Sequence, residues 1–414
     1  MKERGDKRDF EVEVSDIAFG GDGVARADGK VLFMPGVIDG EKVSGRIVED
    51  RKRFAKASCS KIILASPHRI EAKCPLAFVP GRASAREFCP GCSYQHVSYA
   101  HEIEIKKKQL IDLILRIGRL PEKPDIIAIP SPQELHYRNK ISLHLAKKTE
   151  VSKYLGYVMT DNKSVIEIKN CPLAVEPINS RISEILSDKS ALKNMNEQDV
   201  LFLRFSHNDG VMDWIDGKGA PEKILKEKTC IGELVVPLSS FFQTNVFASR
   251  ILFETVLNVL EELKPKTLLD FYCGTGIFAL SGALSGAKIA IGVESDFRAV
   301  EAAKINAENL RVSDRAFFLA NFAGEEAEDL LTKNSGSGTM AIVDPPRSGM
   351  EQRLLTALMS NPPEKIVYVS CAPDTMSRDM KILCQDKYAV EKIFLADLFP
   401  RTPHFESVVL MGRR

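Results

Sequence analysis

The first sixty residues alternate apolar and polar positions with a period of two, and they show no helical period. Runs such as Phe10–Phe19 and Phe54–Leu64 are separated by turn signals at Gly20–Gly23 and Asp28–Gly29. Several short strands divided by such turns are typical of a small closed barrel. We therefore expect residues 1–62 to form a five-stranded β-barrel.

The middle of the chain contains both strand-like runs, with a period of two, and runs with the helical period. Apolar residues recur at helical spacing between positions 97 and 119, which predicts an amphipathic helix that packs on the C-terminal domain. Strand-like runs follow between Leu135 and Leu234, with one helical segment near Asn179–Leu186. Residues 63–240 are therefore predicted to form an α+β domain.

From Asn245 onward, apolar strands alternate with helical stretches, which indicates an α/β fold with a doubly wound parallel sheet. The last two strand-like runs, Tyr388–Phe399 and Glu406–Arg413, have no helix between them. A hairpin at this place is typical of the Rossmann-like fold of S-adenosylmethionine (SAM) methyltransferases rather than of dehydrogenases. Residues 241–414 are the predicted catalytic domain.

Composition agrees with several domains and excludes some classes of protein. The chain has 414 residues, 44% of them hydrophobic, which is too many for one core and suits a soluble globular protein. The first ten residues lack the apolar core of a signal peptide, and the longest apolar region, Leu268–Val293, is interrupted by polar residues. We therefore expect a cytoplasmic protein outside membranes, whose nine cysteines are thiols, metal ligands or catalytic groups.

The net charge of +1 conceals a regional difference. Residues 61–230 hold 26 basic and 21 acidic residues, whereas residues 231–414 hold 19 basic and 23 acidic residues. A basic middle favours a polyanion there and a different ligand in the acidic part. Lys106–Lys108 and His136–Lys140 are candidates for contacts with the phosphates and bases of a nucleic acid, although a charged run can equally be a solvated face.

A nucleotide-type site is predicted where a strand runs into Gly274-Thr275-Gly276 and then into a helix, because backbone there can approach a ligand closely. The next strand ends in Glu294, whose carboxylate can accept hydrogen bonds from both hydroxyls of a ribose. NAD and SAM both contain that ribose, so these residues alone fit either cofactor. Reactive groups elsewhere on the sheet favour SAM.

Two further strand ends carry candidate reactive groups. Asp344–Pro346 forms a stiff turn, since two prolines leave few backbone conformations, and Arg347 follows where amine methyltransferases of the DPPY type place an aromatic residue. Cys371 ends the next strand, and a helix beginning at Asp374 is expected to lower the pKa of its thiol. This position makes Cys371 a candidate nucleophile.

Glu406 begins the last strand in a partly apolar segment. A carboxyl group in such surroundings tends to have a raised pKa and can exchange protons near neutrality. His404 is a competing base or a solvated loop residue, and position favours Glu406. Alone, Cys371 would more often be a buried apolar residue, but together with Asp344 and Glu406 it indicates covalent catalysis.

Four cysteines suggest a metal site. Cys89 and Cys92 form a CxxC pair, with Cys74 upstream and Cys171 far downstream. Four thiolates suit either zinc or an iron–sulfur cluster, and the spacing does not choose between them.

The segments DFYCGTG, DPPRSGM, VSCAPDTMSRD and FPRTPHFESVVL together resemble the RNA (uracil-5-)-methyltransferases, and the resemblance spans the whole chain. It implies a TRAM domain, an RNA-binding OB-fold barrel, in residues 1–62. It also implies a 4Fe-4S cluster, and the implied ligands of the cluster are Cys74, Cys89, Cys92 and Cys171. The implied SAM-binding residues are Gln243, Tyr272, Glu294, Asn321 and Asp344.

The resemblance further implies that Cys371 adds to C6 of a uridine, that C5 receives the methyl group of SAM, and that Glu406 removes the C5 proton. A TRAM barrel with a cluster favours ribosomal RNA over transfer RNA as substrate, with the uridine taken out of its stack. We expect a monomer. Two other hypotheses stay open, a non-catalytic RNA-binding or assembly factor and a nicotinamide-dependent enzyme.

Overall fold

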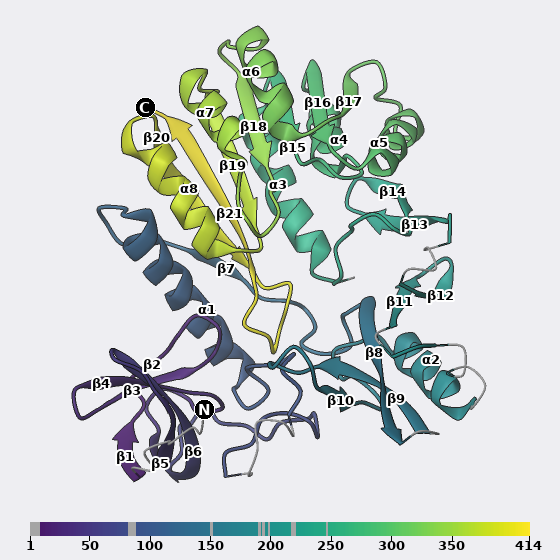
Figure 1. Cartoon of the computed structure of the whole chain (residues 1–414). Coiled ribbons are helices and arrows are strands. Elements are labelled where there is room, and N and C mark those ends of the chain that lie inside the picture. The colour runs from purple at the N-terminus through teal and green to yellow at the C-terminus, as the bar shows by residue number, and fades with distance from the viewer. Residues whose placement is uncertain are drawn as a thin grey trace.

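The computed structural model describes residues 9–81, 88–149, 152–188, 192, 195–197, 199–216, 221–245 and 247–414, with backbone alone at positions 148, 149 and 152. Figure 1 shows three parts: a barrel near the N-terminus, a sheet with one helix, and a large C-terminal sheet between two layers of helices. The lower edge of the large sheet in this view, where β19 ends and β21 begins, faces the other two parts.

The N-terminal part is a curled sheet that closes on itself. Its strands are β1 Asp9–Glu13, β2 Asp16–Ile17, β3 Gly23–Ala27, β4 Lys30–Met34, β5 Lys42–Asp50 and β6 Phe54–Leu64, in the order β1-β5-β6-β4-β3-β2. Because only Val14 and Ser15 separate β1 from β2, one bent segment forms both edges of the sheet. The result is a barrel with an apolar interior, in which β1 and β2 together count as one strand of the predicted five.

Within the described residues, the C-terminal sheet has eight strands in the order β17-β16-β15-β18-β19-β21-β20-β7. Seven of them are β15 Thr267–Phe271, β16 Ile289–Glu294, β17 Ala316–Ala320, β18 Thr339–Val343, β19 Lys365–Ser370, β20 Tyr388–Ala396 and β21 Glu406–Arg413. The helices are α3 Ser249–Leu263, α4 Ile277–Leu284, α5 Phe297–Asn309, α6 Ala323–Lys333, α7 Gln352–Ser360 and α8 Pro373–Asp386. β21 is antiparallel to both neighbours, which confirms the predicted doubly wound sheet with a terminal hairpin.

The central strands of this sheet are buried along most of their length. Every residue of β18 is buried, as a parallel strand covered on both faces requires. One apolar core lies on the side of α6, α7 and α8, and a second on the side of α3, α4 and α5. The sheet is therefore a rigid support for the residues at its edge.

A long helix connects the barrel to this sheet. α1 (Tyr99–Leu113) ends in a π-helical turn, η2 (Ile114–Gly118), and Leu110 shares a core with Met380 of α8. β7 (Ile127–Ile129) then pairs in parallel with β20 and forms the outer edge of the sheet. The sequence does not reveal this strand, because three residues are too few to show an alternation.

The middle part is an antiparallel sheet with a helix on one face. Its described strands are β8 Lys140–Thr149, β9 Ser152–Val158, β10 Val165–Glu167, β11 Val200–Ser206 and β12 Gly210–Ile215, in the order β10-β9-β8-β11-β12. α2 (Glu176–Ser187) packs on this sheet through Ile178 and Ile182. A hairpin of β13 (Ile224–Thr229) and β14 (Gly232–Pro237) leads on to α3. In the described ranges, each helix is too short or too polar to span a bilayer.

A buried ion network fastens the loop between β20 and β21 to α1. Lys106 is fully buried, lies 2.7 Å from Glu102 and donates a hydrogen bond of 2.8 Å to Asp397. The hydroxyl of Tyr99 donates to Asp397 at 2.9 Å, and Glu102 accepts a hydrogen bond of 2.7 Å from the backbone N–H of Arg401. The loop that leads into β21 is therefore fixed by the helix beside it.

Two residues that the sequence singles out for RNA belong to this junction. Lys106 is enclosed by the network, and the prediction that it meets RNA is wrong. Tyr137 is fully buried, and its hydroxyl donates a hydrogen bond of 2.8 Å to the carbonyl of Pro400. Lys108 is exposed and pairs with Asp16 on the barrel. The basic run is thus divided between the interior and the surface.

Lys106→Met should destabilise the protein strongly, because Asp397 would remain buried without a cation and Glu102 would keep only Arg401, at 3.6 Å. We expect a loss of about 3–5 kcal/mol in the free energy of unfolding, measured by urea denaturation. Lys108→Met on the same helix is the matched control, since an exposed ion pair contributes less than about 1 kcal/mol. Equal losses in the two variants would contradict the assigned role of the network.

Candidate active site

Cys371 and Glu406 lie beside each other at the carboxyl edge of the C-terminal sheet. β19 and β21 are antiparallel, and their last paired residues are Ser370 and Ser407. One step further in the same register brings Cys371 opposite Glu406 on one face of the sheet. The two side chains are close enough for the charge of Glu406 to raise the pKa of the Cys371 thiol.

The thiol of Cys371 is held in its neutral form. Burial, and then the charges of Glu406 and Asp344, raise its pKa to about 11. Although α8 begins at Pro373, two residues after the thiol, the pKa of Cys371 is raised rather than lowered. The expectation of a lowered pKa is therefore wrong for the free protein. The side chain is partly exposed, so a substrate can reach it.

Arg347 opposes this effect, and the sequence analysis gave it no role in the reaction. Its side chain hydrogen-bonds with the Cys371 thiol and lowers the pKa of that thiol, and its charge also lowers the pKa of Glu406. The backbone of Arg347 is anchored to α8, because its carbonyl accepts a hydrogen bond of 3.1 Å from the Thr375 hydroxyl. An arginine in the loop after β18, the strand that neighbours the one leading to Cys371, is the signal that could have revealed it.

The carboxyl group of Glu406 is buried at the first position of β21. Burial, and then the charge of Asp344, raise the pKa of Glu406 well above its ordinary value. His404 is half-buried, and burial together with the cations Arg347 and Arg138 lowers its pKa to about 4. An imidazole of this kind is neutral at physiological pH and a weak base, so the electrostatics favour Glu406 as the proton acceptor.

Three predicted cofactor residues follow or end neighbouring strands at the same edge. Tyr272 follows β15, Glu294 ends β16, and Asp344 follows β18, and the parallel register of these strands places them side by side. The carboxylate of Glu294 accepts a hydrogen bond of 3.1 Å from the backbone N–H of Gly274. The hydroxyl of Tyr272 accepts a hydrogen bond of 3.1 Å from the backbone N–H of Glu351.

The other two predicted cofactor residues lie on flanking segments. Asn321 follows β17, where its backbone N–H donates a hydrogen bond of 3.0 Å to the carbonyl of Glu294. Gln243 is buried in the segment between β14 and α3. Beside Glu294, Gly274 has a φ of +52°, and a Cβ there would meet no atom within 4 Å. The strand edge is therefore open at the position where a ligand would approach the backbone.

This edge is acidic. Burial, and then the charge of Glu294, raise the pKa of Asp344 to about 7. Asp270, which the sequence analysis missed, is fully buried in β15, and burial raises its pKa well above the ordinary value although it accepts a hydrogen bond of 2.9 Å from Ala279 N–H. A cationic ligand relieves such repulsion, whereas the pyrophosphate of NAD increases it. The charge of the site therefore fits the sulfonium cofactor.

The four predicted metal ligands come together from three segments of the chain. Burial, and also the thiols of Cys171 and Cys74, raise the pKa of Cys89 to about 11. Burial, and also the thiols of Cys89 and Cys171, raise the pKa of Cys92. All four side chains are partly exposed. The fold thus gathers residues that are far apart in sequence.

A cation and a buried hydroxyl lie beside this cysteine group. In the part of the chain that the structure describes, which includes these four cysteines, no three His, Cys, Asp or Glu side chains are arranged to hold a metal ion. The guanidinium of Arg138 faces Cys92 and Cys171. The hydroxyl of Tyr157 lies against Cys171 and is buried without an ordinary hydrogen-bond partner. The predicted 4Fe-4S cluster therefore stays a prediction.

Comparison with known proteins supports the same interpretation. The TRAM domain model matches residues 7–59, and the model of the tRNA (uracil-5-)-methyltransferase family matches residues 236–414. An uncharacterized RNA methyltransferase of Protochlamydia amoebophila is 30% identical over 96% of this chain and 96% of its own length. The chain belongs to the RNA (uracil-5-)-methyltransferase family. A further uncharacterized RNA methyltransferase, from Aquifex aeolicus, is 29% identical over 97% of this chain and 98% of its own.

Among solved structures, the methyltransferase resembles Pyrococcus abyssi tRNA (uracil-54, C5)-methyltransferase in complex with S-adenosyl-L-homocysteine. The TM-score is 0.70 at 24% identity, over 97% of this chain and 100% of that chain. This likeness shows that the fold is shared. The predicted TRAM barrel, SAM-dependent methyltransferase domain, RNA substrate and enzyme class are confirmed, which excludes the nicotinamide enzyme and the non-catalytic factor.

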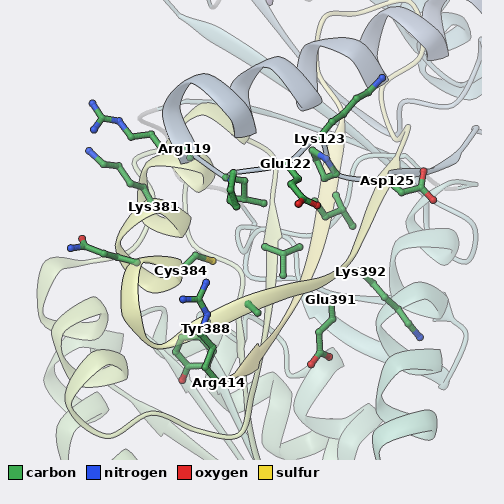
Figure 2. Close-up of a pocket in the computed structure, with 18 residues that line it drawn as sticks. Arg119, Glu122, Lys123, Asp125, Lys381, Cys384, Tyr388, Glu391, Lys392 and Arg414 are labelled. Carbon is green, nitrogen blue, oxygen red and sulfur yellow. The ribbon is translucent and has the colours of Figure 1, made fainter.

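A cavity of about 770 Å³ lies away from the active site of this methyltransferase (Figure 2). Its lining comes from the residues after η2, the end of α8 and the start of β20, so it lies at the opposite edge of the sheet. Charged side chains surround it, including Arg119, Lys381 and Arg414. Glu391 and Lys392 form ion pairs with residues outside the cavity. None of the predicted site residues lines it.

Removing the charge of Glu406 and removing the charge of Arg347 should shift the pKa of Cys371 in opposite directions. Glu406→Gln removes a repelling charge and lowers the pKa, whereas Arg347→Gln removes an attracting charge and raises it. At pH 8 we expect iodoacetamide to alkylate Cys371 about tenfold faster in Glu406→Gln and about tenfold slower in Arg347→Gln. Peptide mass spectrometry measures the rate. Cys384, whose pKa burial also raises to about 11, is the internal control. Changes in the same direction would contradict this electrostatic description.

Proposed function

We propose that this methyltransferase acts by covalent catalysis, with Cys371 as nucleophile and Glu406 as base. The observation that carries the proposal is the partly exposed thiol opposite a buried carboxyl group across β19 and β21. C5 of uracil is a weak nucleophile, and a sulfur bonded to C6 makes it electron-rich. Covalent catalysis thus divides one difficult step into easier ones.

In the proposed reaction, the Cys371 thiol first releases its proton to solvent. The thiolate forms a bond to C6, and the electron pair of the C5–C6 double bond moves towards C5 and the carbonyl at C4. When bound, SAM supplies the methyl group to C5. Glu406 then takes the proton from C5, the double bond forms again, and the Cys371 sulfur leaves as a thiolate. Uridine is thereby converted to 5-methyluridine.

Arg347 supports both partners in this scheme. Its hydrogen bond to Cys371 favours the thiolate, and its charge favours the ionised carboxylate of Glu406. The negative charge of Asp344 acts against both ionisations. A cationic ligand beside Asp344 would offset that charge, so cofactor binding is expected to prepare the thiol and the base together.

The acidic strand edge is the proposed SAM site. Glu294 is suited to the ribose hydroxyls, and Asp344 to the positively charged end of the cofactor. The full proposed set is Gln243, Tyr272, Glu294, Asn321 and Asp344. The open space beside Gly274 supports a ligand at this place.

Ribosomal RNA is the proposed substrate, since the combination of a TRAM barrel and a cysteine group resembles that of enzymes that methylate large-subunit ribosomal RNA. Transfer RNA is the alternative, and the P. abyssi structure is named for it. We further propose a monomer that works in the cytoplasm.

A 4Fe-4S cluster is the proposed occupant of Cys74, Cys89, Cys92 and Cys171. When bound, it would join three chain segments in the middle part, and no electron is needed for the methyl transfer. Arg138 lies near Cys92, Cys171 and His404, so a cluster on these thiols would lie near the loop that precedes Glu406. Its role is therefore proposed to be structural.

Methyl transfer to RNA tests the proposed reaction. With unmodified total RNA from a strain lacking the gene, wild-type enzyme should transfer radiolabelled methyl groups to the ribosomal RNA fraction. Cys371→Ala should reduce this rate at least about a thousand-fold, because the nucleophile is lost. Glu406→Gln should accumulate RNA bonded to protein, because the C5 proton stays in place.

Cys384→Ala, which removes a thiol remote from the edge, is the control and should keep full activity. Unchanged methylation by Cys371→Ala would overturn the covalent scheme. Label in the transfer RNA fraction alone would overturn the ribosomal assignment and leave the chemistry intact.

Anaerobic purification tests the cluster. We expect iron and acid-labile sulfide in equal amounts, with the broad visible absorption of a 4Fe-4S cluster. Cys89→Ser should lose both, whereas Cys59→Ser, a buried thiol in the barrel, should keep them. Zinc in place of iron, or iron retained in Cys89→Ser, would contradict the assignment.

A further inference from the structure

A loop of the barrel reaches the catalytic part next to the proposed base. The loop between β2 and β3 carries Phe19, whose ring centroid lies 6.2 Å from that of Phe405, with the rings at 79°. Phe405 is fully buried and immediately precedes Glu406, whereas 41% of Phe19 is exposed. One part of the Phe19 ring therefore contacts the protein while the rest is open at the rim of the site.

The loop is held firmly in this position. The side chain of Gln109 on α1 donates a hydrogen bond of 2.8 Å to the carbonyl of Ala18, and the hydroxyl of Ser93 donates one of 3.1 Å to the carbonyl of Gly20. At Gly21, φ is +101°, and a Cβ would lie 2.5 Å from the Cβ of Ser93. A bulkier residue cannot stand there without moving the neighbouring segment, so the exposed ring is presented in one place.

We propose that Phe19 is a stacking residue for the RNA, binding an unpaired base next to the uridine that enters the active site. The inference rests on the proposed function, because it needs a uridine at Cys371 and Glu406. Extruding a nucleotide leaves its neighbours without a stacking partner. An aromatic ring fixed at the rim supplies one, and stacking does not depend on the identity of the base.

The position in the barrel supports the same partner. Since β1 and β2 form one bent strand, the loop that carries Phe19 connects the first and second strands of the barrel. In OB folds this loop is one of those that bind oligonucleotides. The barrel thus contributes a contact at the active site itself, in addition to any contact along its outer surface.

The alternative role of Phe19 is to brace Phe405 and thereby Glu406. Two substitutions separate the two roles. Phe19→Leu keeps an apolar contact with Phe405 but offers no ring for a base, whereas Phe19→Tyr keeps the ring. Phe317→Ala is the matched control. Phe317 is also an exposed phenylalanine, at 47%, but it lies on β17, the edge strand of the C-terminal sheet far from β21.

The experiment measures RNA affinity and methylation separately. Binding is followed by the fluorescence anisotropy of a labelled 12-nucleotide oligouridine, and methylation by transfer to unmodified total RNA. We expect Phe19→Ala and Phe19→Leu to weaken oligouridine binding roughly tenfold and to raise the KM for RNA similarly. The kcat at saturating RNA and the KM for SAM should not change, and Phe19→Tyr and Phe317→Ala should behave as wild type.

Three results would overturn the inference: an oligouridine that binds wild type no more tightly than Phe19→Ala, full recovery in Phe19→Leu, or a fall in kcat with unchanged KM for RNA. Wild-type enzyme that binds RNA in a Phe19-dependent way but transfers no methyl group would instead contradict the proposed function alone.

Discussion

The reactive pair of this enzyme depends on one antiparallel strand in an otherwise parallel sheet. Because β21 runs against β19, its first residue, Glu406, reaches the edge at which β19 delivers Cys371. A parallel strand would bring its last residue to that edge instead. The loop before β21 is tied to α1 through Lys106 and Asp397, so a buried ion network outside the site holds the segment that leads into this strand.

The same edge collects buried acids, and their mutual repulsion links binding to reactivity. Burial and neighbouring charges raise the pKa of Cys371 to about 11 and that of Asp344 to about 7, so the free site keeps its thiol protonated. Arg347 provides the opposing charge. A cationic cofactor would lower the pKa of the Cys371 thiol, so the nucleophile is expected to become reactive only when the cofactor site is filled.

Much of the fold and of the candidate site follows from the sequence, because strand ends in an α/β sheet meet at one edge. Cys371, Glu406 and Asp344 were therefore predictable from their positions after or before apolar runs. The pKa of Cys371, the burial of Lys106 and the contact between Phe19 and Phe405 were not. Each depends on which side chains the fold brings together from distant segments, and local patterns contain no such information.

The central claim is that Cys371 bonds to the uracil ring and that Glu406 later removes the C5 proton. RNA transcribed with 5-fluorouridine tests it most directly, because fluorine occupies the position of that proton and cannot be removed by a base. With this RNA and SAM, mass spectrometry should find a stable adduct between a methylated pyrimidine and the peptide containing Cys371. Methylation of ordinary RNA without any Cys371 adduct on the fluorinated RNA would contradict the mechanism.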